Sequence, residues 1–292
     1  MPRITANGIE IEYDTTGRAD DRPLLLIMGL GAQMIMWDEE FCELLAGYGH
    51  HVIRYDARDT GLSSKFEEAG TPDIPAMMAA VRGGAPANAP YLLKDMADDA
   101  AALLGELGID AAHVVGASMG GMVAQELAIR HAERVLSLTS IMSTTGNPSL
   151  PPARPEAIAR LMQKPQSDRE GYLSTFVESM KILFGSGFPF DEARTRERGE
   201  RLYDRAYYPA GQTRHLAAVL ASGSRREALE SVVLPALVIH GKDDPLVPVE
   251  GGIDTHEALK DSELMLIDGL GHGLPPEVHA KIAQAIADLT AR

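Results

Sequence analysis

The clearest chemical signal is a serine between small residues, in the run Gly116-Ala117-Ser118-Met119-Gly120. This Gly-x-Ser-x-Gly pattern lies between an apolar run, 113–117, that predicts a strand and a stretch, 119–131, that predicts a helix. A serine on such a tight turn needs small neighbours, and the helix N-terminus that follows favours developing negative charge. The string also occurs by chance in ordinary strand-to-helix turns, so alone it leaves a nucleophile and a structural turn equally open.

A histidine and an aspartate downstream are the partners that a nucleophilic serine needs. The histidine accepts the hydroxyl proton, and a carboxylate fixes its tautomer and stabilises its charged form. Asp244 follows the predicted strand 236–241, and His272 follows the predicted strand 263–267. Both therefore lie beyond carboxyl ends of strands, where open parallel sheets place their sites. The sequence predicts Ser118, Asp244 and His272 as catalytic residues.

The elements that must position these residues form an alternation of short apolar runs and amphipathic helical stretches. This alternation is typical of an α/β fold with a mostly parallel sheet flanked by helices. Strands are expected at 9–15, 24–28, 51–56, 113–117, 134–142, 236–241 and 263–267, and helices at 91–107, 119–131, 250–259 and 276–290. Residues 72–90 are expected to be a loop rich in Ala, Gly and Pro.

The strand rhythm stops between Ser143 and about Val233, where four or five helices are expected. We interpret 143–233 as an inserted helical cap on a core domain of residues 1–142 and 234–292. The insert carries eight of the fifteen aromatic residues: Tyr172, Phe176, Phe184, Phe188, Phe190, Tyr203, Tyr207 and Tyr208. These rings could line a pocket or form the insert's own small core, and the pattern leaves both open.

Composition excludes several classes of partner. The 42 acidic and 27 basic residues give a formal charge of −15, which repels nucleic acid and anionic membranes. The lone Cys42 and the absence of a secretory signal predict a reduced, cytoplasmic location. The nine histidines, His215 and His240 among them, show no metal-ligand spacing, and no nucleotide-binding motif is present. We therefore expect no metal and no cofactor.

With Leu24-Leu25-Leu26-Ile27-Met28-Gly29 and the run 52–61, the segments around Ser118, Asp244 and His272 resemble the α/β-hydrolase superfamily. The resemblance extends from Ile9 to the final helix. Within the superfamily the chain looks like the aclacinomycin methylesterase group of carboxylic-ester hydrolases, whose members remove a methyl ester from a polyketide. We expect a small hydrophobic ester as substrate. A lactonase or a perhydrolase on the same fold remains an alternative, as does a ligand receptor with slow turnover.

Further site residues follow from the motif and the resemblance. The backbone N–H of Met119 is expected in an oxyanion hole, and by resemblance the second donor is the N–H of Leu30. Met28-Gly29 stands where His-Gly is commoner in the superfamily. The acid is commonly the third residue after the glycine that ends the strand, which selects Asp244, and Asp243 is expected to be a solvated turn residue.

Two other groups of residues have open interpretations. Methionines in or beside the site loops suit an adaptable apolar pocket but are also common in cores; they are Met28, Met34, Met36, Met119, Met142 and Met180. Asp56, Arg58 and Asp59 are expected to organise the turn after their strand, with a smaller chance of touching substrate.

Overall fold

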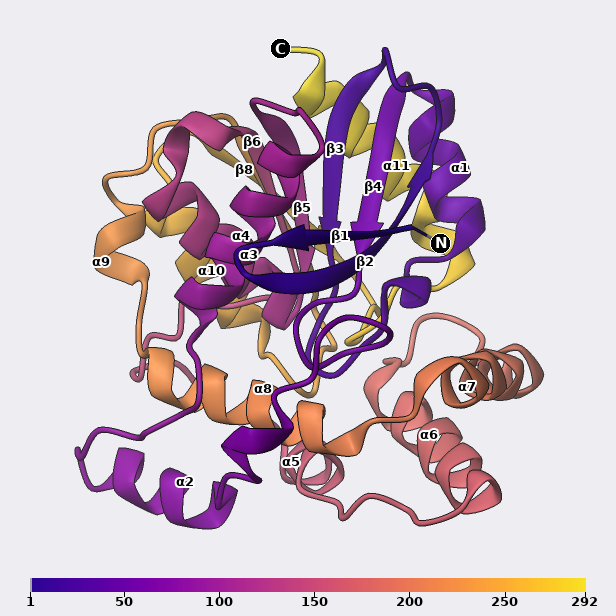
Figure 1. Cartoon of the computed structure of the whole chain (residues 1–292), viewed down its shortest axis with the longest axis vertical. Coiled ribbons are helices and arrows are strands. Elements are labelled where there is room, and N and C mark those ends of the chain that lie inside the picture. The colour runs from indigo at the N-terminus through magenta and orange to yellow at the C-terminus, as the bar shows by residue number, and fades with distance from the viewer. Residues whose placement is uncertain (1) are drawn as a thin grey trace.

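The computed structural model describes residues 2–292 and is built around an eight-stranded sheet (Figure 1). The spatial order is β1-β2-β4-β3-β5-β6-β7-β8, with β1 and β2 antiparallel to their neighbours and the other pairs parallel. The strands are β1 (Arg3–Ala6), β2 (Ile9–Thr16), β3 (Arg22–Ile27), β4 (His50–Tyr55), β5 (Ala112–Ala117), β6 (Val135–Ile141), β7 (Ala236–Gly241) and β8 (Ser262–Ile267).

Helices cover both faces of this sheet because alternate strand residues point to opposite sides. Leu25 and Ile27 share one apolar core with α3 (Leu93–Glu106), α4 (Met119–Arg130) and α10 (Val249–Ala258). Leu24 and Leu26 share the other with α1 (Glu39–Gly47) and α11 (Pro276–Thr290). Among residues 2–292, no helix is both long and apolar enough to span a membrane.

The chain between β6 and β7, residues 142–235, is termed the β6–β7 segment. Its helices are α5 (Pro155–Leu161), α6 (Arg169–Leu183), α7 (Glu192–Ala206), α8 (Pro209–Ser222) and α9 (Arg226–Leu229). In Figure 1, α5 to α8 lie beyond the edge of the sheet at which the parallel strands end, and α2 (Ile74–Arg82) lies beside α8. Short 3-10 turns occur at Met34–Met36, Glu67–Ala69 and Ala132–Arg134.

The predicted strands and helices are present with ends shifted by at most two residues, and the α/β fold class is confirmed. The expectation of a loop over 72–90 is wrong, because this stretch contains α2. The Asp73 side chain accepts the Ala76 N–H and caps the helix, and Ile74 and Met77 pack in an apolar cluster with residues of α8.

Strand β1 was not anticipated. It pairs with β2 through a two-residue turn in which Asn7 and Gly8 both have positive φ, 50° and 76°. Asn-Gly is the preferred pair for such a tight hairpin. The hairpin extends the sheet at the edge formed by β2.

A buried ion pair attaches α8 to the sheet and the helices that cover it, which are together termed the sheet assembly. Arg214 donates from Nε to Asp59 Oδ2 at 2.7 Å and from Nη2 to Asp59 Oδ1 at 2.9 Å, with side chains only 1% and 0% exposed. Burial alone would raise the pKa of Asp59, but hydrogen bonds from Arg214, the Phe66 amide and the Tyr91 hydroxyl lower it. The carboxylate therefore stays charged and binds the arginine bidentately.

Helix α7 is attached by a row of ion pairs that runs from exposed pairs at Arg194 and Arg201 to a largely buried pair at Arg205. Four arginines spaced by four, three and four residues lie along one side of the helix. They pair with carboxylates at the start of α1 and with the carboxylate of the residue after β4. The pairs are Arg194 with Glu40, Arg198 with Asp38, Arg201 with Glu39 and Arg205 with Asp56.

Replacing Arg214 with Ala should lower the free energy of unfolding by about 3–5 kcal/mol, because Asp59 would remain as an uncompensated buried charge. Urea denaturation measures the loss. The matched control is Arg169→Ala, which breaks an exposed pair with Asp204 and should leave the midpoint near that of the unmodified protein. Equal midpoints for both variants would contradict the structural importance of the buried pair.

Candidate active site

Ser118 occupies the turn between β5 and α4 in a backbone conformation that non-glycine residues rarely adopt. Its φ is 57° and its ψ is −122°. The Ser118 N–H donates to the Ile141 carbonyl at 2.9 Å, and the Ser118 carbonyl accepts the Ser143 hydroxyl at 2.8 Å. Such strain persists only where the surroundings fix the backbone, and strained residues of this kind cluster at functional sites.

Three glycines make this turn possible by removing side chains at close backbone contacts. A Cβ on Gly116 would lie 2.2 Å from the Gly120 oxygen, and a Cβ on Gly120 would lie 2.1 Å from the Ile27 oxygen. A Cβ on Gly121 would lie 2.6 Å from the Ser143 Cβ. The small residues of the motif therefore allow β5, α4 and β3 to approach closely enough to hold Ser118.

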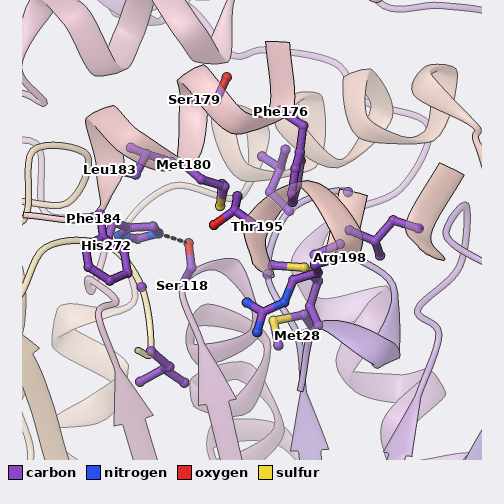
Figure 2. Close-up of a pocket in the computed structure, with 18 of the residues that line it drawn as sticks. Met28, Ser118, Phe176, Ser179, Met180, Leu183, Phe184, Thr195, Arg198 and His272 are labelled. Carbon is purple, nitrogen blue, oxygen red and sulfur yellow. Dashed lines mark hydrogen bonds between the residues drawn. The ribbon is translucent and has the colours of Figure 1, made fainter. Parts of the chain in front are cut away.

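The structure brings Ser118, His272 and Asp244 into one hydrogen-bonded row. His272 Nε2 lies 2.8 Å from Ser118 Oγ (Figure 2). On the other side of the ring, His272 Nδ1 lies 2.7 Å from Asp244 Oδ2. Because a carboxylate only accepts, the neutral ring carries its proton on Nδ1 and presents a bare Nε2 to the serine hydroxyl. The arrangement can move a proton from Ser118 to His272 while Asp244 stabilises the resulting charge.

Asp244 is held for this contact by its own backbone. Its Oδ1 accepts the N–H groups of Leu246 and Val247 at 2.8 and 2.9 Å, which leaves Oδ2 for His272. The adjacent Asp243 instead accepts the Ser186 hydroxyl at 2.5 Å. Of the two neighbouring acids, the structure thus places Asp244 against the histidine.

His240 supports the same loop. It is buried, and its Nε2 lies 2.8 Å from the Val247 carbonyl and 3.6 Å from Asp244 Oδ2. Its Nδ1 has no hydrogen-bond partner among residues 2–292. Burial lowers the pKa of His240, which favours a neutral ring that donates to Val247. His240 is therefore a structural histidine with one unpaired nitrogen.

The His272 loop also depends on the end of α6. The His272 N–H donates to the Leu183 carbonyl at 2.6 Å, and the Gly271 N–H donates to the Phe184 carbonyl at 3.0 Å. A Cβ on Gly271 would lie 2.2 Å from the Leu183 oxygen. The β6–β7 segment thus fixes the backbone that carries the histidine.

The two backbone amides predicted as oxyanion donors belong to the residue after Ser118 and to the loop after β3. Met119 is the first residue of α4, and Leu30 lies in the loop after β3, residues 29–32, which is termed the oxyanion loop. A Cβ on Gly29 would lie 3.1 Å from the Ser118 Cβ, so this loop passes directly beside the serine. Within the described chain, neither the Leu30 nor the Met119 amide has a backbone acceptor. Both are available to an oxyanion.

A cavity of about 640 Å³ opens over Ser118 and His272 and is lined by both the sheet assembly and the β6–β7 segment. Figure 2 shows Phe176, Met180 and Leu183 of α6 on the side opposite Ser118, with Phe184 next to His272. Of the six methionines that the sequence places in or beside the site loops, four line the cavity: Met28, Met36, Met142 and Met180. The other two, Met34 and Met119, are buried elsewhere. The methionine-lined pocket is confirmed for those four.

The aromatic residues of the β6–β7 segment both form a small core of their own and line the cavity. Tyr172 stacks with Phe176 and contacts Tyr203 and Tyr207, which makes a small aromatic core between α6 and α7. Tyr172, Phe176 and Tyr207 also line the cavity.

Polar lining residues escaped the sequence analysis. Thr195 and Arg198 of α7 point into the cavity in Figure 2, and the Arg198 Nη2 donates to both Asp38 oxygens at 2.5 and 2.6 Å. His215 of α8, one of the histidines without metal-ligand spacing, accepts the Gly31 N–H of the oxyanion loop at 3.0 Å. Only contacts distant in sequence reveal these residues. Among residues 2–292, no three His, Cys, Asp or Glu side chains are grouped to hold a metal ion.

A family model described as the alpha/beta hydrolase fold matches residues 22–277. The chain belongs to the α/β-hydrolase family. This α/β-hydrolase is 31% identical to rhodomycin D methylesterase DauP of Streptomyces sp. (strain C5), over 97% of this chain and 95% of that protein. The predicted superfamily is confirmed, as is the likeness to methylesterases.

One further relative and one solved structure are similar to this α/β-hydrolase. It is 28% identical to 3-oxoadipate enol-lactonase 2 of Acinetobacter baylyi, over 91% of this chain and 87% of that protein. Its fold matches the solved 2-hydroxy-6-oxo-6-phenylhexa-2,4-dienoate hydrolase of Rhodococcus sp. strain RHA1 with a TM-score of 0.79 at 19% identity, covering 99% and 98% of the two chains. The family relationship supports a hydrolase.

Replacing Gly120 with Ala should destabilise this α/β-hydrolase by about 1–3 kcal/mol, because the new methyl group would overlap the Ile27 carbonyl. Gly47→Ala is the matched control, since Gly47 lies near the end of α1 with open space around it and should be neutral or slightly stabilising. Chemical denaturation compares the free energies of unfolding. An equally stable Gly120→Ala protein would show that the turn around Ser118 is not tightly packed.

Proposed function

We propose that this protein is a serine hydrolase that cleaves carboxylic esters through an acyl-enzyme intermediate. The single observation that carries the proposal is the row of hydrogen bonds from Ser118 Oγ through His272 to Asp244, at 2.8 and 2.7 Å. In this proposal the three residues are catalytic, and the amides of Leu30 and Met119 form the oxyanion hole.

The mechanism has two halves that use the same groups. Ser118 Oγ attacks the ester carbonyl carbon while His272 Nε2 takes the hydroxyl proton, and the two amides bind the oxyanion. His272 then protonates the departing alkoxide, which leaves as an alcohol. In the second half His272 takes a proton from water, the hydroxide attacks the acyl group, and Ser118 leaves with its proton restored. The products are the alcohol and a carboxylic acid.

The cavity supports a hydrophobic, bulky acyl group. Its volume of about 640 Å³ falls within the range of drug-sized ligand sites, and its methionine and aromatic lining suits apolar surface. The relation to a rhodomycin D methylesterase favours a methyl ester as the bond cleaved. We further propose that residues 143–233 form a cap domain over the core of 1–142 and 234–292. A cytoplasmic location remains a prediction.

Lactone hydrolysis is the second candidate, favoured by the relation to an enol-lactonase. A lactone is an internal ester, so the same groups would open it, and the alcohol would stay attached to the product. The values of kcat/KM for methyl esters, p-nitrophenyl esters and lactones of matched carbon number separate the two. A preference of about tenfold or more for lactones would move the assignment to lactonase.

Ser118→Ala should abolish ester hydrolysis and leave the fold intact, because only the nucleophilic oxygen is removed. We expect kcat to fall by about 10⁶-fold by analogy with serine proteases, measured with a p-nitrophenyl ester, while the circular dichroism spectrum and unfolding midpoint persist. Ser143→Ala is a matched control, since the Ser143 hydroxyl donates to the Ser118 carbonyl and not to the Ser118 side chain; it should retain most activity. Normal turnover by folded Ser118→Ala protein would refute the mechanism.

The acids Asp243 and Asp244 provide a second test within one loop. Asp244→Asn should reduce kcat on the order of 10⁴-fold, because an amide can hold His272 in the wrong tautomer. Asp243→Asn retains an acceptor for Ser186 and should reduce kcat little. Assays of both variants with one ester decide the assignment, which is wrong if Asp243→Asn is the inactive variant.

A further inference from the structure

We propose that His215 of α8 is a positioning residue that sets the oxyanion loop for catalysis. The inference rests on the proposed function, because it concerns the Leu30 donor of the oxyanion hole. It assigns a role in the reaction to a side chain outside the Ser118, His272 and Asp244 row.

The two ring nitrogens of His215 hold two different segments of backbone. Nδ1 lies 3.0 Å from the Gly31 nitrogen, and Nε2 lies 2.7 Å from the Arg58 carbonyl oxygen. Because an amide N–H only donates and a carbonyl only accepts, Nδ1 must be bare and Nε2 must carry the proton. The ring is fully buried, and this burial lowers its pKa to about 4, so it is neutral at pH 7.

The bond to Gly31 acts directly on the peptide that follows Leu30. The Leu30–Gly31 peptide is planar, so fixing the Gly31 N–H direction also fixes the orientation of the Leu30 carbonyl and restricts the loop on that side. Gly31 has a φ of +65°, and a Cβ there would lie 2.9 Å from the Gln212 side chain, so α8 packs closely against it. The Ala32 N–H donates to the Gly29 carbonyl at 3.1 Å and closes the turn. The Leu30 amide remains for the oxyanion.

The groups around His215 make it a rigid support. The neighbouring Arg214 binds Asp59 in the buried pair, and the Arg58 side chain donates to both Asp99 oxygens at 2.6 Å. The ring of Tyr91 meets the His215 ring edge-on, with centroids 6.2 Å apart. Helix α8 of the β6–β7 segment therefore supports the oxyanion loop through His215.

Two substitutions separate the two hydrogen bonds of His215. In His215→Asn the amide oxygen takes the place of Nδ1 and can accept the Gly31 N–H, whereas the contact with Arg58 is lost. In His215→Gln the amide nitrogen takes the place of Nε2 and can donate to Arg58, whereas Gly31 loses its acceptor. Positioning predicts that His215→Gln lowers kcat about 10- to 100-fold with little change in KM, and that His215→Asn retains kcat within about threefold.

The matched control is His50→Gln. His50 is also fully buried, and both of its ring nitrogens are hydrogen-bonded, to Leu45 and Thr290. It is the first residue of β4, whereas Ser118 follows the last residue of β5, so the two lie at opposite ends of the parallel strands. Its replacement should lower the unfolding midpoint without lowering kcat of the folded fraction. A loss of kcat equal to that of His215→Gln would mean that general destabilisation explains the effect, and would overturn the proposal.

Amide hydrogen exchange tests the loop without turnover. Exchange over the oxyanion loop should be faster in His215→Gln than in His215→Asn, because only the former leaves the Gly31 N–H unpaired. If the unmodified protein hydrolyses esters and the two variants have equal kcat, the positioning role is wrong. If the unmodified protein hydrolyses no ester, the proposed function fails, and equal exchange in the two variants would then overturn the support of the loop by His215 as well.

Discussion

Ser118 holds a left-handed backbone conformation at the end of β5, and its neighbours are arranged so that it cannot relax. Such a conformation costs on the order of 1–3 kcal/mol, which the surrounding packing must offset. The contact of Gly120 with the Ile27 carbonyl sets the distance between α4 and β3. Because α4 and β3 are this close, the loop that follows β3 passes beside Ser118. One strained residue thereby fixes the relation of nucleophile, helix N-terminus and oxyanion loop.

The β6–β7 segment supplies backbone and side-chain supports for groups that belong to other parts of the chain. The end of α6 holds the His272 loop through the carbonyls of Leu183 and Phe184, and α8 holds the oxyanion loop through His215. Helix α8 is itself attached by the buried pair of Arg214 and Asp59, whereas the arginines of α7 form more exposed pairs. The segment is therefore attached at α8 through a buried pair, and at α7 through pairs that are exposed at Arg194 and Arg201 and largely buried at Arg205.

The sequence predicted what short-range patterns and chain order determine. Buried apolar runs revealed the parallel strands, and Ser118, Asp244 and His272 followed strand ends in an order that placed them at one edge of the sheet. The signals for β1 and α2 were present in Asn7-Gly8 and in Asp73 with the proline at 75, but short elements at an edge carry little hydrophobic periodicity. Both elements are therefore marked by their turn and cap residues and not by a hydrophobic pattern.

Other features depend on contacts that no local pattern contains. His215 and Gly31 are 184 positions apart, and no motif marks a histidine that accepts a backbone amide. Asp56 and Asp59 do organise the turn after β4, where they accept the Leu62 and Phe66 amides, but their pairing with Arg205 and Arg214 required the placement of α7 and α8. Long-range ion pairs of this kind follow from tertiary packing alone.

Covalent trapping shows directly whether Ser118 is the reactive nucleophile. A fluorophosphonate reacts with an activated serine by forming a bond from Oγ to phosphorus and releasing fluoride. Tryptic peptide 95–130 contains Ser118 as its only serine, so mass spectrometry assigns the modified side chain within it unambiguously. We expect one equivalent of label on this peptide, with ester hydrolysis lost in proportion to labelling. Full hydrolysis by labelled protein, or inactivation by label on another peptide, would contradict it.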